Sequence, residues 1–333
     1  MYAAYGVASP FLPAFVNSRG IAPEELGLVL GTATAVRLVS APLAGRIGDL
    51  LGALRTVLVL CIALAALTTL GYLRAEHFWA FLAVSALQAA ALAPMSVLAD
   101  ALALGAAKRQ GFEYGWVRGT GSAAFIAGTL AAGQAVAAAG LGVIVALQAL
   151  LLGVAAGAAL FVPDLPQPHA ARAGRESVMS LLRLREFRYV VLIAALVLGS
   201  HAMHDAFAMI RWRAAGVGPQ TGAMLWSEAV LAEVIVFFAI GPALLRRLTP
   251  TGALALAAIA GIVRWGVLAA STQVLAAQAI YGTVGIGGAT ALATFSSGSL
   301  YGRLGAAGFW VMALICAGAL PLVWRLGRSS ALH

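Results

Sequence analysis

A few charged side chains lie inside long apolar stretches of this sequence, where an ionisable group is costly to place. Arg37 lies near the middle of the stretch 24–47, and Glu233 lies at a similar depth in the stretch 220–245. A charge at the centre of a membrane helix costs on the order of 3 kcal/mol, so such residues usually line a polar cavity or pair with each other. We predict that both side chains face a central cavity, and a purely structural ion pair is the alternative.

A second group of polar residues has a spacing that could support chemistry. His201, His204 and Asp205 share one face of a helix, because they are three and four residues apart. Histidine titrates near neutral pH, so this face could belong to a substrate or proton pathway. We expect a substrate pocket or a packing face here rather than a metal site.

A third group stands between two apolar stretches. Arg46 and Asp49 close one stretch, and Arg55 opens the next. Residues at the ends of a span lie near the membrane surface rather than at its centre. We therefore expect these three side chains to act in gating or in docking a loop, rather than in contacting a substrate.

The elements that must position all these residues are membrane-spanning helices. Hydrophobic residues make up 62% of the 333-residue chain and charged residues only 10%, far below the roughly 25% of a soluble domain. Apolar stretches of about twenty residues recur, each long enough to cross a hydrocarbon core of about 30 Å. They are apolar on nearly every face, whereas barrel strands alternate polar and apolar residues. The sequence therefore predicts an all-α polytopic membrane protein.

Eleven spans are predicted from these stretches. The longest polar segment, residues 163–186, contains prolines and basic residues and is predicted to be a linker. It separates an N-terminal bundle, residues 1–162, from a C-terminal bundle, residues 187–333. The predicted spans cover residues 1–18, 24–47, 53–74, 77–106, 112–139, 141–162, 187–213, 220–245, 250–270, 278–301 and 305–326.

The distribution of basic residues orients these spans. Lys108 and Arg109 follow the fourth span, and other basic residues follow the second and eighth spans and occupy the linker. Because basic residues are enriched in cytoplasmic loops, the N-terminus and the linker are predicted to lie inside. Four arginines stand at the opposite ends of spans, against this bias: Arg19, Arg74, Arg211 and Arg213.

The two halves are related by an internal repeat. An offset of 196 residues pairs Arg37 with Glu233 and aligns several glycines and prolines across the first three spans of each half. Further on, Tyr114-Gly115 aligns with Tyr281-Gly282 at an offset of 167. The difference of 29 residues equals one membrane helix. The second half therefore lacks a counterpart of residues 77–106, which would be the tenth of twelve spans.

Several segments resemble the major facilitator superfamily, in particular its phenylpropionate permease branch, which is related to lactose permease and to nucleoside:proton symporters. The resemblance implies two six-helix bundles and alternating access around a central site, driven by proton co-transport. The motif GRIGDLLGALR follows the second span. More specific are ADALALGAAKRQGFEYGWVRGTGSAAF (99–125), HAMHDAFAMIRWRAAG (201–216), LWSEAVLAEVIVFF (225–238), GIVRWG (261–266) and GFWVMALI (308–315).

The resemblance also implies roles for individual residues. Asp100 and Arg118 match a carboxylate in span four and an arginine in span five that bind the sugar in lactose permease. Gly119-Thr120 stands where that family has a tryptophan, which argues against a sugar. Arg264 matches a span-nine arginine that serves proton coupling, whereas the coupling histidine and glutamate of lactose permease belong to the missing span ten.

These residues favour secondary transport of a small organic anion, and the resemblance implies that the transport is coupled to protons. Arg37, Arg118 and Arg264 make the interior cationic, and Trp226 and Trp265 offer ring surfaces for a phenylpropionate-type acid. A nucleoside or sugar:proton symporter is the alternative within transport. A non-transporting remnant is a third interpretation, because one span is missing.

Other classes of function are disfavoured. The scattered arginines form no aromatic and basic cluster of the kind that binds nucleic acid. No nucleophile or metal-ligand constellation stands at a water boundary, so we expect neither enzyme activity nor a cofactor. We expect a monomer in the cytoplasmic (inner) membrane, whose partners are lipid, the substrate and a proton.

The missing span leads to a geometric prediction. The ninth span should end outside and the helix that begins near Gln278 should start inside, with only residues 271–277 between them. Seven extended residues reach at most about 25 Å, less than a hydrocarbon core of about 30 Å. We therefore expect a break in the chain between Ser271 and Gln278, or displaced final helices if the chain is continuous.

Overall fold

The computed structural model describes residues 1–163, 183–236, 238 and 250–270, and it divides into two compact units. The first unit is Met1–Leu254 and the second is Ala255–His333, and each is described by itself. The predicted spans 278–301 and 305–326, and the predicted break between Ser271 and Gln278, lie outside the described residues.

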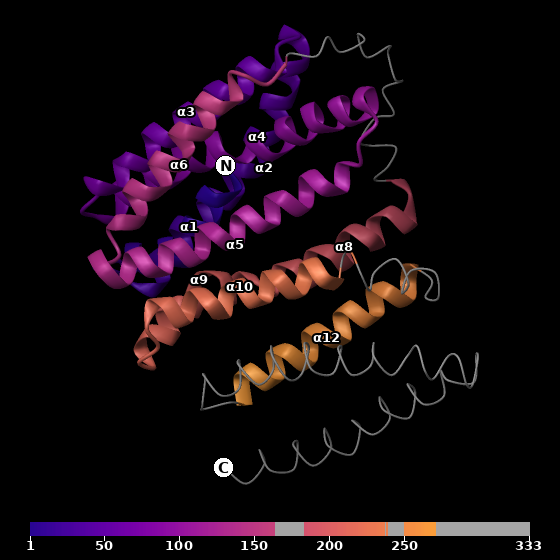
Figure 1. Ribbon diagram of the computed structural model, residues 1–333. Coiled ribbons are helices and arrows are strands. Elements are labelled where there is room, and N and C mark those ends of the chain that lie inside the picture. The colour runs from indigo at the N-terminus through magenta and orange to yellow at the C-terminus, as the bar shows by residue number, and fades with distance from the viewer. Residues whose placement is uncertain (164–182, 237, 239–249, 271–333) are drawn as a thin grey trace, which may run out of the picture. The chain divides into compact units, whose positions relative to one another are not determined.

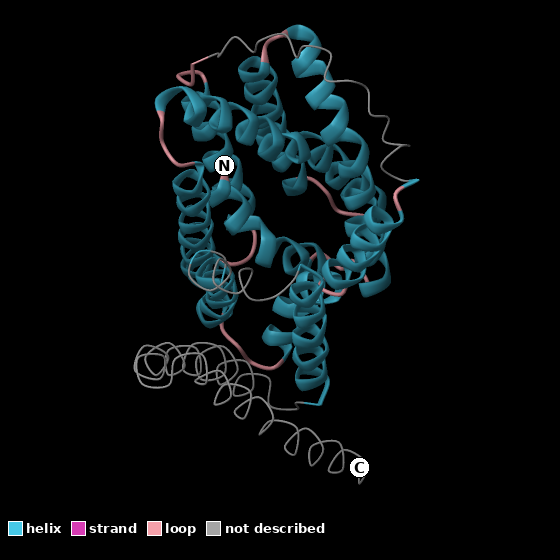
Figure 2. Ribbon diagram, turned by 90° about the vertical axis from the view of Figure 1, so that its right-hand side faces the viewer, coloured by secondary structure: helices cyan, strands magenta, loops and turns pink. Residues whose placement is uncertain are grey.

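All regular structure in the described part of the chain is helical (Figures 1 and 2). Helices follow the predicted spans closely, because long apolar runs without strand periodicity satisfy their backbone groups only as helices. The elements are α1 (Tyr2–Ser18), α2 (Pro23–Leu51), α3 (Leu54–Leu70), the short 3₁₀ helix η1 (Gly71–Leu73), α4 (Phe78–Gln110), α5 (Tyr114–Ala139), α6 (Val143–Ala159), α8 (Arg185–Gly199), α9 (Ala202–Ala214), α10 (Pro219–Ile235) and α12 (Pro250–Ala270).

Five segments of the described chain are long and apolar enough to cross a membrane. Shorter apolar helices cover Val143–Ala159 and Ala255–Trp265. These findings agree with a polytopic membrane protein, while the total of eleven spans and the two-bundle arrangement stay predictions. The five segments are Pro23–Gly48, Leu54–Leu73, Phe78–Gln110, Tyr114–Ala139 and Phe187–Ala214.

Helix α4 runs four residues beyond the predicted end of its span. It continues to Gln110 because nothing in the preceding Lys108-Arg109 pair breaks a helix, and cations are favourable near a helix C-terminus. Gly111 then ends it with a left-handed φ of 73°, a conformation that glycine adopts without steric cost.

The span predicted at 187–213 is interrupted. Helix α8 ends at Gly199 and α9 begins at Ala202, with a turn at Ser200 and His201 between them. The Ser200 hydroxyl donates to the Val197 carbonyl oxygen at 2.7 Å, and His201 Nδ1 lies 3.1 Å from the same oxygen. Side-chain bonds to a carbonyl of the last turn compete with the helical ladder, which accounts for the interruption.

Helices α1 and α5 are in backbone contact. A side-chain carbon at Gly6 would collide with the Phe125 carbonyl, and one at Gly128 would collide with the Ala3 carbonyl. The Thr129 hydroxyl, which is fully buried, donates to the Gly6 carbonyl oxygen at 2.9 Å. Small residues allow this approach, as in other membrane helix pairs.

Helices α5 and α10 pack antiparallel. Ala223, near the start of α10, meets Gly133 near the end of α5, while Phe238, just beyond α10, meets Gly119 near the start of α5. Gln220 Nε2 donates to Gln134 Oε1 at 2.7 Å beside the first of these contacts. This contact joins segments that belong to different halves of the predicted repeat.

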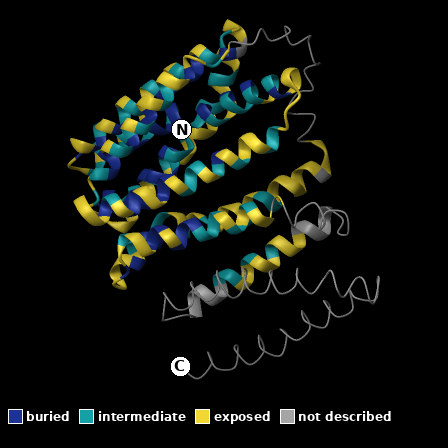
Figure 3. Cartoon of the chain, in the orientation of Figure 1, coloured by how far each residue is buried: buried dark blue, intermediate teal, exposed yellow. Residues whose placement is uncertain are grey.

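The apolar core of the first unit lies mainly between α1, α3, α4 and α6. Figure 3 shows buried residues concentrated in these helices, whereas α8 is coloured mostly as exposed. Two side chains at its centre are Ile62 and Met95, which are 2% and 0% exposed. Exposed apolar side chains such as Leu196, at 68%, are ordinary for a helix surface that faces lipid.

Candidate functional site

A cluster of polar side chains from three helices joins Asp100 with Arg118. Asp100 comes from α4, Arg118 from α5, and Tyr2 from the start of α1. Arg118 Nη1 donates to the Tyr2 hydroxyl at 2.7 Å and lies 3.5 Å from Asp100 Oδ2. The Arg118 guanidinium also lies over the Tyr2 ring, 5.7 Å from its centroid. The two residues that the family resemblance singles out are therefore neighbours.

The cluster is accessible and has unused hydrogen-bonding capacity. The side chains of Arg118 and Asp100 are 47% and 34% exposed. A guanidinium has five N–H donors in a planar fork, and one nitrogen makes both of the contacts just given. Such a fork can bind a carboxylate through two parallel hydrogen bonds. The cluster can therefore accept an anionic or hydrogen-bonding ligand.

Two tyrosines of this cluster were missed by the sequence analysis. Tyr114, the first residue of α5, lies close enough to Asp100 to interact with its carboxylate. Its position four residues before Arg118 on one helix was a usable signal, because residues at that spacing share a face. Tyr2 had no comparable signal, since the crossing of α1 over α5 is a tertiary contact.

Arg37 lies on α2 and Glu233 lies on α10, and both side chains are exposed. Arg37 is close enough to Tyr5 on α1 to interact with it electrostatically. The Tyr5 hydroxyl itself donates to the Leu92 carbonyl oxygen at 2.8 Å, which ties α1 to α4. The pairing of Arg37 with Glu233 stays a prediction.

His204 lies in an aromatic cluster between α9 and α10. Its ring stacks on Trp226 with centroids 5.6 Å apart and planes at 18°, and it meets Trp212 edge-on at 6.0 Å. His201 lies at the turn before α9, and Asp205 is exposed in the first turn of α9. Within the described ranges, no group of three or more His, Cys, Asp and Glu could hold a metal ion.

The predicted gating residues lie around the junction of α2 and α3. Arg46 is exposed on α2, which extends to Leu51. Asp49 lies on the same helix, and its side chain is not among the parts that the structure describes. Arg55 Nη1 donates to the Val162 carbonyl oxygen at 3.4 Å, just beyond α6. A role in gating stays a prediction for all three residues.

Arg264 lies in the second unit, on α12. Its guanidinium lies 4.8 Å from the centroid of the Trp265 ring, a cation–π contact. Because the two units are described separately, the convergence of Arg264 with the cluster on α1, α4 and α5 stays a prediction.

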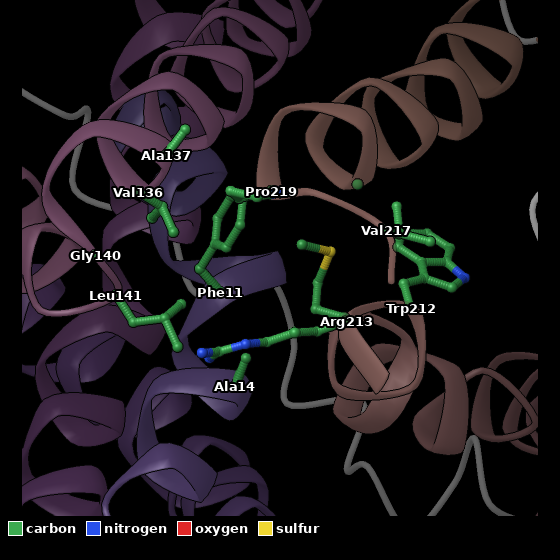
Figure 4. A pocket seen from close by; sticks show the side chains of 12 residues that line it. Phe11, Ala14, Val136, Ala137, Gly140, Leu141, Trp212, Arg213, Val217 and Pro219 are labelled. Atoms are coloured by element: carbon green, nitrogen blue, oxygen red, sulfur yellow. The ribbon is translucent and has the colours of Figure 1, made fainter. Parts of the chain in front are cut away.

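A pocket of about 340 Å³ lies between α1, α5, α9 and α10. Figure 4 shows Arg213 reaching from α9 across the pocket toward Ala14 and Leu141, with Phe11 and Trp212 among the walls. The lining residues are Phe11, Ala14, Val136, Ala137, Gly140, Leu141, Met209, Trp212, Arg213, Val217, Pro219 and Gly222.

The sequence of this chain is similar to those of known transport proteins. The sequence model of the MFS_1-like family matches residues 1–277. A probable 3-phenylpropionic acid transporter of Escherichia coli (strain K12) is 34% identical over an alignment of 370 positions. The alignment covers 96% of this chain and 93% of that protein. A maltose permease of Geobacillus stearothermophilus is 26% identical over 266 residues, covering 80% of this chain and 67% of the permease.

A solved structure also resembles this chain. The crystal structure of the nucleoside transporter NupG aligns with a TM-score of 0.68 at 17% sequence identity. The alignment covers 84% of this chain and 75% of that one. A likeness at this level of identity concerns the fold alone.

Proposed function

Because the chain belongs to the MFS_1-like family of the major facilitator superfamily, we propose that it takes up a small organic anion together with a proton, by alternating access. The relatives that match it are transporters, and the sequence has the apolar helices of a multi-pass membrane protein. The proposal adds a substrate class and a coupling ion to membership of a transporter family.

The observation that carries this proposal is the half-exposed Arg118 between Tyr2 and Asp100. A guanidinium with unused donors favours a carboxylate over the neutral hydroxyls of a sugar or nucleoside. The name of the Escherichia coli relative specifies an acid with an aromatic ring, which supports the same substrate class. A phenylpropionate-type acid would bind Arg118 through its carboxylate.

The architecture that this function requires follows from the repeat. We propose an N-terminal bundle of residues 1–162, a cytoplasmic linker of residues 163–186 and a C-terminal bundle of residues 187–333. The central site would lie between the bundles and include Arg37, Glu233 and Arg264 with the described cluster. The protein would act as a monomer in the cytoplasmic membrane.

Uptake into proteoliposomes tests the proposal. Labelled 3-phenylpropionate should accumulate when a pH gradient is imposed, acid outside, while uridine and maltose should not. Arg118→Ala should abolish accumulation, whereas Arg74→Ala, which removes an exposed arginine next to η1, should not. Accumulation of uridine or maltose in place of the acid would contradict the proposed substrate, and accumulation without a gradient would contradict proton coupling.

A non-transporting remnant is a second candidate, favoured by one observation. The family match ends at residue 277, next to the point where the repeat offset changes by one helix length. Sequencing the gene between the codons for Ser271 and Gln278 addresses this candidate directly. Additional codons for a tenth span would exclude the remnant, and an uninterrupted frame with no uptake of any tested substrate would support it.

A further inference from the structure

The pocket between α1, α5, α9 and α10 is separate from the Asp100 and Arg118 cluster. It lies near the ends of α5 and α9 and the start of α10, whereas Arg118 lies near the start of α5. Gly140 and Leu141 of the lining follow Arg118 by more than twenty residues, and at 1.5 Å per residue this is on the order of 30 Å along α5. The pocket therefore has to be explained on its own.

The charge pattern places this pocket toward the outer side of the membrane. Lys108 and Arg109 end α4, and Arg185 and Arg188 begin α8, so these helix ends are cytoplasmic by the positive-inside rule. Helix α9 continues the span that begins with α8, and its last turn, which holds Arg213, is then at the opposite surface. Arg213 is one of the four arginines that run against the charge bias.

The lining of the pocket specifies a kind of ligand. Of the twelve described residues that line the pocket, Arg213 alone is charged. The walls include Phe11 and Trp212, which are 1% and 2% exposed and so form fixed aromatic surfaces. A volume of about 340 Å³ is at the small end of the range for ligand pockets, roughly 300–1,000 Å³. An aromatic ring on a short chain that ends in a carboxylate matches both the walls and the charge.

We propose that this pocket is a second, outer binding site for a small aromatic carboxylate, whose carboxylate pairs with Arg213. The ligand class follows from the pocket itself, so the site does not depend on the function proposed for Arg118. This site would explain why Arg213 lies on the outer side, against the cytoplasmic bias of basic residues, because a cation there attracts the anion from the outer solution.

The pocket is also shared by both halves of the repeat. Its lining from α1 and α5 belongs to the first half, and its lining from α9 and α10 belongs to the second. The Gln134 and Gln220 hydrogen bond lies beside it and joins the same halves. A ligand that contacts both halves stabilises the conformation in which they touch. Occupancy of the outer site therefore opposes opening at the outer surface and inhibits uptake at high substrate concentration.

Binding stoichiometry of the purified full-length protein tests this inference. Radiolabelled 3-phenylpropionate should bind at two sites in the unchanged protein. Arg213→Gln should weaken one of them by at least about tenfold, as expected for a lost charge-assisted pair, and should relieve inhibition at high substrate. Arg118→Ala should remove the other site only. The alcohol 3-phenylpropanol, which has the same ring but no carboxylate, should not compete at the site that Arg213→Gln weakens.

Two further variants make the result unambiguous. Arg211→Gln removes a neighbouring exposed charge from the same helix and should leave both sites intact. Arg213→Lys keeps the charge without the planar fork and should weaken the outer site less than Arg213→Gln does. A single site that Arg118→Ala removes and Arg213→Gln leaves unchanged would overturn this inference while the proposed transport stands. Two sites that are both unaffected by Arg213→Gln would overturn it as well, and so would the absence of any binding.

Discussion

Two polar clusters in the first unit differ both in charge and in exposure to solvent. One joins Tyr2, Asp100, Tyr114 and Arg118, and its arginine and aspartate are 47% and 34% exposed. The other joins α3, η1, α4 and α6 through neutral side chains that are at most 4% exposed. The residues of this buried network are Thr69, Tyr72, Ser85, Gln88 and Gln148.

The buried network is centred on one glutamine. Gln88 Nε2 donates to Thr69 Oγ1 at 2.8 Å and to Gln148 Oε1 at 3.5 Å, and Gln88 Oε1 accepts from the Tyr72 hydroxyl at 3.1 Å. In an apolar medium an unpaired polar group is costly, so such a network is stabilising only when its members are paired. The buried network makes its hydrogen bonds internally and so fixes the packing of the helices. The accessible cluster has spare hydrogen-bond donors and so can bind a ligand.

The largest expected effect is that of Arg118→Ala on uptake. Removing one partner of a hydrogen-bonded charge pair costs about 2 kcal/mol or more, so uptake at low substrate should fall about 30-fold or further. Membrane insertion and melting temperature should change little, because the side chain is half exposed. Uptake of labelled acid into proteoliposomes measures this effect. Full activity of Arg118→Ala would show that Arg118 does not bind the substrate, and the accessible cluster would then have no functional difference from the buried network.

Gln88→Leu should have the opposite effects, with a large loss of stability and no change in substrate binding. It leaves Thr69, Tyr72 and Gln148 without their shared partner, so the free energy of unfolding should fall by about 3 kcal/mol. Thermal unfolding in detergent measures this change, with Gln110→Leu at the exposed end of α4 as the control. The KM of the protein that remains folded should be unchanged. A large rise in KM would show that the buried network also serves the substrate.

Tyr2→Phe tests the accessible cluster more finely. The loss of the 2.7 Å hydrogen bond from Arg118 should lower uptake about five- to tenfold. Tyr5→Phe, one turn further along α1, removes a bond to the Leu92 carbonyl instead and should affect stability rather than KM. Equal effects of the two variants on KM would contradict the assignment of Tyr2 to the site.

Ser85→Ala should produce the smallest change. The Ser85 hydroxyl shares one hydrogen bond with Tyr72 at 2.9 Å, and Tyr72 keeps Gln88 as a second partner. We expect a loss of about 1 kcal/mol in stability and no change in uptake. Ser96→Ala, elsewhere on α4, is the matched control for the melting temperature. A loss as large as that of Gln88→Leu would mean that the network depends on each member rather than on its central glutamine.

Most of the helices could be predicted from the sequence because they depend on local signals. Apolar runs located α1 to α6 closely, although the end of α4 was placed four residues too early, at residue 106. The interruption at Ser200 and His201 was missed, since it depends on which side chains bond to the Val197 carbonyl. A continuous apolar run gives no sign of that choice.

The candidate site was predictable only where a family motif or helix spacing applied. The motifs singled out Asp100 and Arg118, whose contact the structure describes, while their role stays a prediction. Gln88 and Gln148 stand in separate apolar stretches, and a polar residue in each was a signal that they should pair. The contact of Tyr2 with Arg118 depends on how two helices cross, which spacing within either helix does not determine.

The backbone contact between α1 and α5 has a consequence for how the accessible cluster works. Gly6 and Gly128 leave no room for one helix to slide along the other, and the buried Thr129 bond fixes their register. Tyr2 and Arg118 therefore move together as one rigid clamp. In the function proposed above, this clamp is assembled before the substrate arrives, so little conformational entropy is lost on binding. In that proposal, release comes from displacement of the opposing helices, and not from any loosening between these two.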